Sequence, residues 1–403
     1  MPLPLVFILI TVALDAIGIG LIFPVMPDLI REVSGTTLSQ AAVWGGVLAT
    51  SYAVMQFLFG PVLGALSDRF GRRPVLLVSL GLMTADYLVM AVASTIWLLL
   101  ALRIVSGIAA ATYSTAAAYI ADITPPDQRG KRFGLIGACF GVGFVLGPVI
   151  GGLLAGIDTR APFLVAAGLA GANLIFGLLV LPETVTDATR RPFAFGRANP
   201  LGALRAVSRL PGIGRTLACF LILGIAMNVY PATWAYFGQA RFGWDSSMVG
   251  FSLAVYGLSF AVGQAVLVGP LIRRFGEHRA AFYGMWVNVI TLAALGLVVS
   301  PALALAIIPM TALGGVVTPA LQAIASRAAP ADAQGEVQGV MASLNAIAMI
   351  VAPLLMTGTF SAFTGPGAPV FSPGAPFLLA AVLMLGCLAL HGAGVRVSAS
   401  KPA

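Results

Sequence analysis

Long apolar stretches recur along the whole chain, and short segments that hold most of the charged residues separate them. Each stretch is about twenty residues long, which is the length of an α-helix that crosses a bilayer. We therefore predict twelve transmembrane helices. They cover residues 4–30, 41–66, 73–94, 96–121, 132–157, 161–182, 213–238, 247–273, 278–300, 301–325, 335–361 and 373–395.

The composition agrees with this pattern. Of the 403 residues, 59% are hydrophobic and only 9% are charged, whereas a soluble domain usually has about a quarter of its residues charged. The sequence therefore predicts an all-α integral membrane protein. The first stretch contains Asp15, Pro24 and Pro27 and no Lys or Arg precedes it, so we expect a first span rather than a cleaved signal peptide.

The net charge of +8 is explained by topology. If both termini face the cytoplasm, 18 of the 22 Lys and Arg residues fall on the cytoplasmic side, as the positive-inside rule requires. No basic surplus is left that would indicate a nucleic-acid partner. Cys139, Cys219 and Cys387 lie far apart in apolar stretches, which indicates packing roles rather than a disulfide framework or a metal site.

Two halves of the chain repeat each other at an offset of 205 residues. The matching pairs are Arg69 and Arg274, Phe70 and Phe275, Gly71 and Gly276, Pro125 and Pro330, Asp127 and Asp332, Gly130 and Gly335, Gly134 and Gly339, and Pro148 and Pro353. We predict an N-terminal six-helix bundle over residues 1–182, a cytoplasmic linker over 183–212 with a surface helix near 199–210, and a C-terminal six-helix bundle over 213–403. Internal repeats of this kind are typical of transporters, whose substrate site lies near the midplane of the bilayer.

Three charged residues lie inside predicted spans, namely Asp15, Asp86 and Arg103. A charge at the centre of a transmembrane helix costs about 2.5–3.5 kcal/mol on the lenient insertion scale. Either Arg103 pairs with one acid as a structural ion pair, or at least one acid carries a proton. Two acids facing one base leave a carboxylate without an obvious partner, which favours the proton carrier.

The second half offers neutral polar side chains instead. These are Asn228, Gln264, Asn288, Gln322 and Asn345. Amides lining a cavity suit an amphipathic ligand, because binding sites combine apolar walls with a few placed polar groups. The alternative is hydrogen bonding between neighbouring helices, which such residues also make in membranes.

Two further motifs lie at helix ends or in a span. In the run at 141–152, Gly143, Gly147 and Gly151 are four residues apart and Pro148 lies between them, which indicates close helix packing or a hinge. The stretch GALSDRFGRRP at 64–74 places a carboxylate at a helix end, then a glycine turn and three arginines. It predicts ion pairs at the cytoplasmic face that hold one conformation of the protein closed. The alternative is a solvated loop without such pairs. Its candidate gating residues are Gly64, Asp68, Arg69, Gly71, Arg72 and Arg73.

These motifs resemble a known family. GALSDRFGRRP is similar to the signature loop of the major facilitator superfamily, LALRIVSGIAAA to its fourth-helix motif, and GVGFVLGPVIGG to the fifth-helix motif of its drug/proton antiporters. The segments TVALDAIGIGLIFPVMPDLIRE, AAYIADIT, GPLIRRFGE and PALQA resemble the tetracycline/proton antiporters of Gram-negative bacteria.

The resemblance implies a twelve-helix major facilitator fold that alternates between inward-open and outward-open states. It implies a proton-coupled antiporter that exports a small amphipathic drug, such as tetracycline bound to magnesium, across the bacterial inner membrane. It implies that Asp15, Asp86 and Arg103 serve proton coupling. It further implies that Asp68 and Arg72 belong to the gate formed by the signature loop, and Gly147 and Pro148 to the antiporter motif. No cofactor is implied, and the expected partners are drug, protons and membrane lipid, with the chain working as a monomer.

The departures from that branch fall in the second half. Asn288 stands where the tetracycline exporters carry an acid, Phe260 replaces a histidine, and Gln239 and Ala240 replace acids. An amide cannot release a proton or attract a cationic chelate, so export of another drug or of an endogenous metabolite stays open. A membrane enzyme and a non-transporting receptor are weaker alternatives, since no hydrophilic domain, phosphate-binding loop or histidine site is evident.

Overall fold

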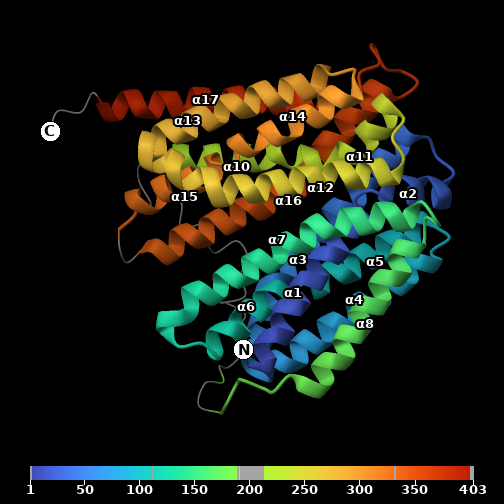
Figure 1. Cartoon of the computed structure of the whole chain (residues 1–403), viewed down its shortest axis with the longest axis vertical. Helices are drawn as coiled ribbons and strands as arrows, with labels where there is room; N and C mark the ends of the chain where they lie inside the picture. Colours follow the sequence, from blue (N-terminus) through green and yellow to red (C-terminus); the bar gives the residue numbers. More distant parts are fainter. Residues whose placement is uncertain (1, 111, 188–189, 191–212, 331–332, 400–403) are drawn as a thin grey trace. The chain divides into compact units, whose positions relative to one another are not determined.

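The computed structural model describes residues 2–110, 112–187, 190, 213–330 and 333–399 (Figure 1). These described residues form helices joined by short connections, without a β-strand. The surface helix expected near residues 199–210 lies outside them.

The helices of the first half follow one another in chain order. They are α1 (Leu3–Ile22), α2 (Met26–Ser34), α3 (Leu38–Phe70), α4 (Arg72–Val92), α5 (Ile96–Ala109), α6 (Thr112–Asp122), the 3-10 turn η1 (Pro126–Gln128), α7 (Arg129–Ala155) and α8 (Ala161–Val180). Those of the second half are α10 (Gly214–Met227), α11 (Val229–Phe242), α12 (Ser246–Val262), the π-helix η3 (Gly263–Leu267), α13 (Val268–Leu297), α14 (Pro301–Gly314), α15 (Val317–Ala328), α16 (Gln334–Thr364) and α17 (Ala375–Ala399).

Eleven helical stretches of the described residues are long and apolar enough to cross a membrane. The longest, Ser246–Leu297, has 52 residues and contains Gly276 with φ 73° and ψ 164°. An α-helix cannot continue through that backbone conformation, which glycine adopts readily. The stretch is therefore two spans, and the described part of the chain carries the twelve predicted from the sequence.

Large apolar side chains cover the outside of the helices. Trp97, Ile157 and Leu179 are 67%, 82% and 80% exposed, while Phe7 and Phe163 are buried. Helices that are apolar on every face are typical of proteins surrounded by lipid. The structure thus confirms an all-α integral membrane fold.

The chain divides into two compact units. Unit 1 comprises Met1–Thr36, Ser51–Pro200 and Asp245–Ala254, and unit 2 comprises Thr37–Thr50, Leu201–Trp244 and Val255–Ala403. Within unit 1, α1 runs along α7, and α4 runs along α8 (Figure 1). The two bundles predicted from the sequence are consecutive segments of the chain. The compact units are instead groups of residues that pack together, and each contains separate segments of the chain.

The internal repeat is confirmed by the helix bounds. At the offset of 205, α5 (Ile96–Ala109) corresponds residue for residue to α14 (Pro301–Gly314), and the first residue of α7 corresponds to that of α16. Gly71 precedes α4 with φ 113°, and its counterpart Gly276 has the same sign of φ. The two halves therefore share one helix plan.

Hydrogen bonds repeat at the same offset. Arg129 donates from Nε to the Thr124 carbonyl and from Nη2 to the Ala121 carbonyl, both at 3.3 Å. At the corresponding positions, the Gln334 amide donates to the carbonyls of Ala329 at 3.3 Å and Ser326 at 2.7 Å. Two different side chains thus cap the same helix end in the two halves.

Candidate functional site

The three charges predicted from the sequence gather in unit 1. Asp15 lies on α1, Asp86 on α4 and Arg103 on α5. Tyr52 of α3 and Tyr87 of α4 each interact electrostatically with all three charged side chains. Four helices therefore surround one charged cluster, which we call the intramembrane charge cluster and define by these five residues.

Asp86 is only 6% exposed. Ser106 lies beside its carboxylate, and Oδ1 has no hydrogen-bond partner among the described residues. Arg103 directs Nη2 to Met90 Sδ at 2.9 Å, and within the described ranges no ion pair joins it to Asp15 or Asp86. A buried carboxylate oxygen without a partner is costly while charged, and uptake of a proton removes that cost.

Tyr52, Tyr87 and Ser106 were missed from the sequence. Placing a hydroxyl in an apolar span costs far less free energy than placing a charge there. The sequence alone therefore does not mark these three residues as functional. Once the helices are placed, the Tyr87 hydroxyl occupies the space that a Cβ at Gly18 of α1 would need. The glycine thus lets α1 and α4 approach each other beside the cluster.

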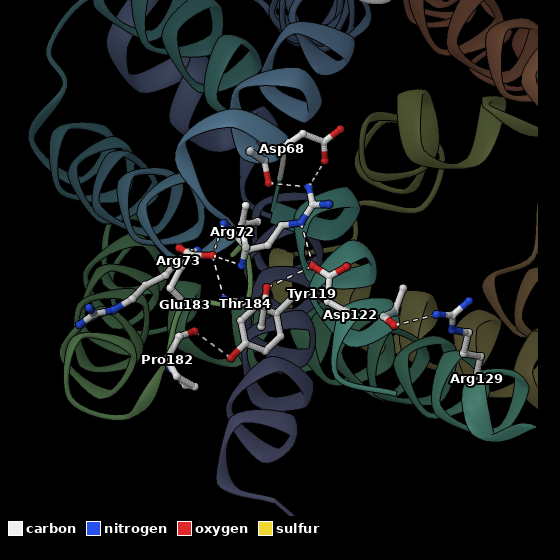
Figure 2. A network of polar contacts seen from close by, with 12 residues as sticks. Asp68, Arg72, Arg73, Tyr119, Asp122, Arg129, Pro182, Glu183 and Thr184 are labelled. Carbon is white, nitrogen blue, oxygen red and sulfur yellow. Dashed lines mark hydrogen bonds and ion pairs between the residues drawn. The ribbon is translucent and has the colours of Figure 1, made fainter. Parts of the chain in front are cut away.

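The signature loop forms a second polar network in unit 1. Figure 2 shows Arg72, the first residue of α4, lying between Asp68 and Asp122. Its Nη1 pairs with Asp68 Oδ1 at 2.6 Å and donates to Ser67 Oγ at 3.0 Å, and its Nε pairs with Asp122 Oδ2 at 3.1 Å. The guanidinium is thus held between carboxylates from two helices, α3 and α6, by charge-assisted hydrogen bonds, which are stronger than neutral ones.

Glu183, just beyond α8, completes this network (Figure 2). Its carboxylate accepts the backbone N–H groups of Arg72 at 2.9 Å and Arg73 at 3.1 Å, and also those of Thr184 at 2.8 Å and Val185 at 2.9 Å. A negative group at a helix N-terminus satisfies free N–H groups and the helix dipole. Glu183 therefore caps α4 from a segment 111 residues away in the sequence.

Gly71 explains why the residue that caps α4 is distant in the sequence. It occupies the N-cap position of α4 with φ 113°, so it has no side chain to accept the N–H groups. The Glu183 carboxylate fills the place of a Cβ at this position. A glycine is needed here both for the backbone conformation and for the space.

The remaining signature residues have simpler surroundings. The Arg69 guanidinium lies 5.1 Å from the centre of the Phe70 ring, and Arg73 donates from Nη2 to the Leu178 carbonyl at 2.9 Å. Gly64 has open space where a side chain would be. Asp122 and Glu183, which the sequence interpretation did not assign to the gate, thus contribute more to this network than Gly64 or Arg69.

We expect Glu183→Ala to lower both stability and transport. The change leaves two helix N–H groups without an acceptor, which typically costs about 1 kcal/mol, whereas Glu183→Gln keeps an acceptor and loses only the charge. Thermal unfolding in detergent should therefore rank wild type above Gln and Gln above Ala. The control is Asp187→Ala, since Asp187 is 96% exposed; equal melting of all four proteins would contradict the capping role.

The antiporter motif of α7 packs against α1. A Cβ at Gly147 would lie 2.5 Å from the Ile17 carbonyl oxygen and 2.9 Å from Gly20 Cα, and Gly143 and Gly151 face backbone atoms of α1 in the same way. Three glycines at this spacing line one helix face. The motif therefore packs closely against the backbone of α1, as the packing interpretation expects.

Pro148 and Gly152, on the same helix, contact the start of α12 within unit 1. A Cβ at Gly250 would collide with the Pro148 carbonyl oxygen, and Ser247 donates to the Gly152 carbonyl at 3.0 Å. This close approach depends on small residues in both helices.

The amides of the second half lie in different surroundings. Asn228 donates to Gly224 O of its own helix at 2.8 Å, and Asn345 contacts Met349 Sδ at 3.8 Å. Gln322 is exposed on α15. Gln264 and Asn288 instead donate to carbonyls of another span, which corresponds to the helix-to-helix alternative left open by the sequence.

Comparison with known proteins matches the chain to the family model described as Major Facilitator Superfamily, over residues 8–353 and again over 216–401. The chain belongs to the major facilitator superfamily. This confirms the resemblance drawn from the three sequence motifs. The second match begins at residue 216, near the start of the second repeat.

Relatives within the superfamily share most of the chain. The class C tetracycline resistance protein of Escherichia coli is 44% identical over 384 residues, which is 95% of each chain. The class G protein of Vibrio anguillarum is 39% identical over 94% of this chain and 95% of its own.

Solved transporter structures have the same fold. A human organic anion transporter matches with a TM-score of 0.69 and 25% identity, over 96% of this chain and 99% of its own. A nucleoside transporter matches with a TM-score of 0.79 at 13% identity, over 98% and 100% of the two chains, and shows the fold alone.

Proposed function

We propose that this protein is a proton-coupled antiporter that exports a small amphipathic drug by alternating access, without chemical conversion of the drug. The intramembrane charge cluster supports this proposal most strongly. Asp86 is buried with a carboxylate oxygen that has no hydrogen-bond partner in the described part of the chain, and Asp15 lies in the same cluster. Such groups inside a membrane span are typical of proton relays.

In this mechanism the acids bind protons when the cluster is open to the periplasmic side and release them on the cytoplasmic side. Each proton removes a buried charge, which changes the relative free energies of the two conformations. The Arg72 network with Asp68, Asp122 and Glu183 would then hold one of these conformations, because its ion pairs join the ends of three helices.

The substrate that we propose is a tetracycline, carried as a chelate with magnesium. The relatives named as tetracycline resistance proteins support it, since they match almost the whole chain at 36–44% identity. The second candidate is a non-tetracycline drug or an endogenous metabolite. Asn288 favours it because a neutral amide, even without touching the drug, lacks the long-range attraction of a carboxylate for a cationic chelate. We place the protein in the bacterial inner membrane as a lipid-surrounded monomer with both termini cytoplasmic.

Everted membrane vesicles test the proposal. A proton gradient is imposed, and a pH-sensitive dye follows its discharge when tetracycline with magnesium, and then a panel of other amphipathic drugs, is added. We expect at least one compound to discharge the gradient, and the active compound identifies the substrate class. Discharge by non-tetracyclines alone would support the second candidate, and no response to any compound would reject antiport.

A further inference from the structure

The tenth span is broken between two helices of unit 2. Its first part, α14, ends at Gly314, and its second part, α15, begins at Val317. Carbonyl groups at a helix end lack their usual N–H partners. The Gly315 carbonyl loses its partner for a second reason, because the residue four positions later is Pro319, which has no N–H.

Two amide side chains supply the missing donors. Gln264 donates from Nε2 to the Gly315 carbonyl at 3.3 Å, and Asn288 donates from Nδ2 to the Gly314 carbonyl at 3.4 Å. Asn288 is 4% exposed, and its side chain fills the place of a Cβ at Gly314. Each of the two carbonyls at the break is therefore satisfied by one side chain from a neighbouring span.

The π-helix η3 places Gln264 for this contact. It interrupts the eighth span over Gly263–Leu267, and Gln264 is its second residue. A Cβ at Gly263 would lie 2.9 Å from Ala312 Cβ, so η3 packs directly against the end of α14. Single π-helical turns often occur at functional positions, because they redirect one side chain within a helix.

The first half lacks these donors. At the offset of 205, Phe59 and Met83 stand where the second half has Gln264 and Asn288, and Ser114 stands in place of Pro319. The corresponding span is also broken, between α5 and α6. The pair of amides is therefore a specific addition to the second repeat and not a general requirement of a broken helix.

We infer that Gln264 and Asn288 are positioning residues that clamp the break in the tenth span, and that this break is where the second half bends during transport. The inference rests on the proposed function. In this account the two amides bind the protein backbone and not the drug. Both bonds are neutral and long, so they are weak enough to open and reform in each cycle.

The test removes each donor with little change in size, in Gln264→Leu and Asn288→Leu. We expect amide hydrogen exchange over residues 313–320, measured in lipid nanodiscs without drug, to become about tenfold faster, as the loss of a buried hydrogen bond implies. Turnover should fall while the KM for the drug stays constant. A changed KM with unchanged exchange would show that these amides contact the drug, and would overturn the clamp.

A rescue variant separates the clamp from general damage to the fold. Pro319→Ala restores a backbone N–H four residues after Gly315. In this background Gln264→Leu should no longer accelerate exchange, whereas Asn288→Leu should still do so. Acceleration by Gln264→Leu that is equal in both backgrounds would overturn the role of Gln264.

Thr359→Val is the matched control, because Thr359 is only partly buried and its hydroxyl donates to the Leu355 carbonyl of its own helix. It should leave exchange over residues 313–320 and turnover unchanged. The exchange measurement needs no transport, so the two proposals fail separately. A wild type that moves no drug rejects the proposed function, and wild-type exchange in both leucine variants rejects the clamp.

Discussion

Replacing either Asp15 or Asp86 by asparagine is expected to abolish drug-driven proton movement. Asparagine is close in size to aspartate but cannot take up a proton in this range of pH. Removing an acid also removes a costly buried charge, so the variants should fold and reach the membrane. In everted vesicles, drug added to either variant should leave the dye signal at the level of vesicles without the protein.

Asp127→Asn is the control for these two variants, since Asp127 is exposed in the turn η1 outside the charge cluster. It should discharge the gradient like wild type. If Asp15→Asn and Asp86→Asn also behave like wild type, the charge cluster is structural and coupling must lie elsewhere.

Replacing Gly147 by valine is expected to have the second-largest effect, on stability. The new Cβ would lie 2.5 Å from the Ile17 carbonyl oxygen, and a backbone atom cannot move aside as a side chain can. Overpacking a close contact typically costs about 1–3 kcal/mol, and here the upper end is expected because α1 and α7 pack along their length. The melting temperature in detergent and the yield of folded protein should both fall.

Gly141→Val tests whether the loss comes from the contact and not from valine in a helix. Gly141 lies on the same helix, α7, and has open space where a side chain would be. Its valine variant should melt close to wild type. A similar loss in both variants would mean that helix propensity, and not the contact between α1 and α7, sets the stability at position 147.

The twelve spans were predictable because length and hydropathy decide whether a helix crosses a bilayer. Asp15, Asp86 and Arg103 were predictable as a functional group for a similar reason, since a charge within a span needs compensation. The internal repeat was visible in Gly71 and Gly276, whose backbone conformations a side chain would strain.

Glu183 was not predictable, because its role depends on N–H groups that are more than a hundred residues away in the sequence. A glutamate after an apolar span looks like the first residue of a linker. Gln264 and Asn288 could be assigned to a ligand or to packing, and periodicity cannot decide between these. Pro319 could have indicated this contact from the sequence. Because proline has no backbone N–H, the carbonyl four residues earlier needs a hydrogen-bond donor from outside its own helix.

The most direct test of the central claim uses purified protein in proteoliposomes with an imposed pH gradient and no ATP. Uptake of the drug identified in the vesicle screen is measured with the gradient in either direction and after a protonophore. Proton-coupled antiport requires that the drug is taken up only when protons move out of the liposome lumen, so we expect uptake to be lost when the protonophore is added. Uptake that is equal with and without the gradient would contradict proton-coupled antiport.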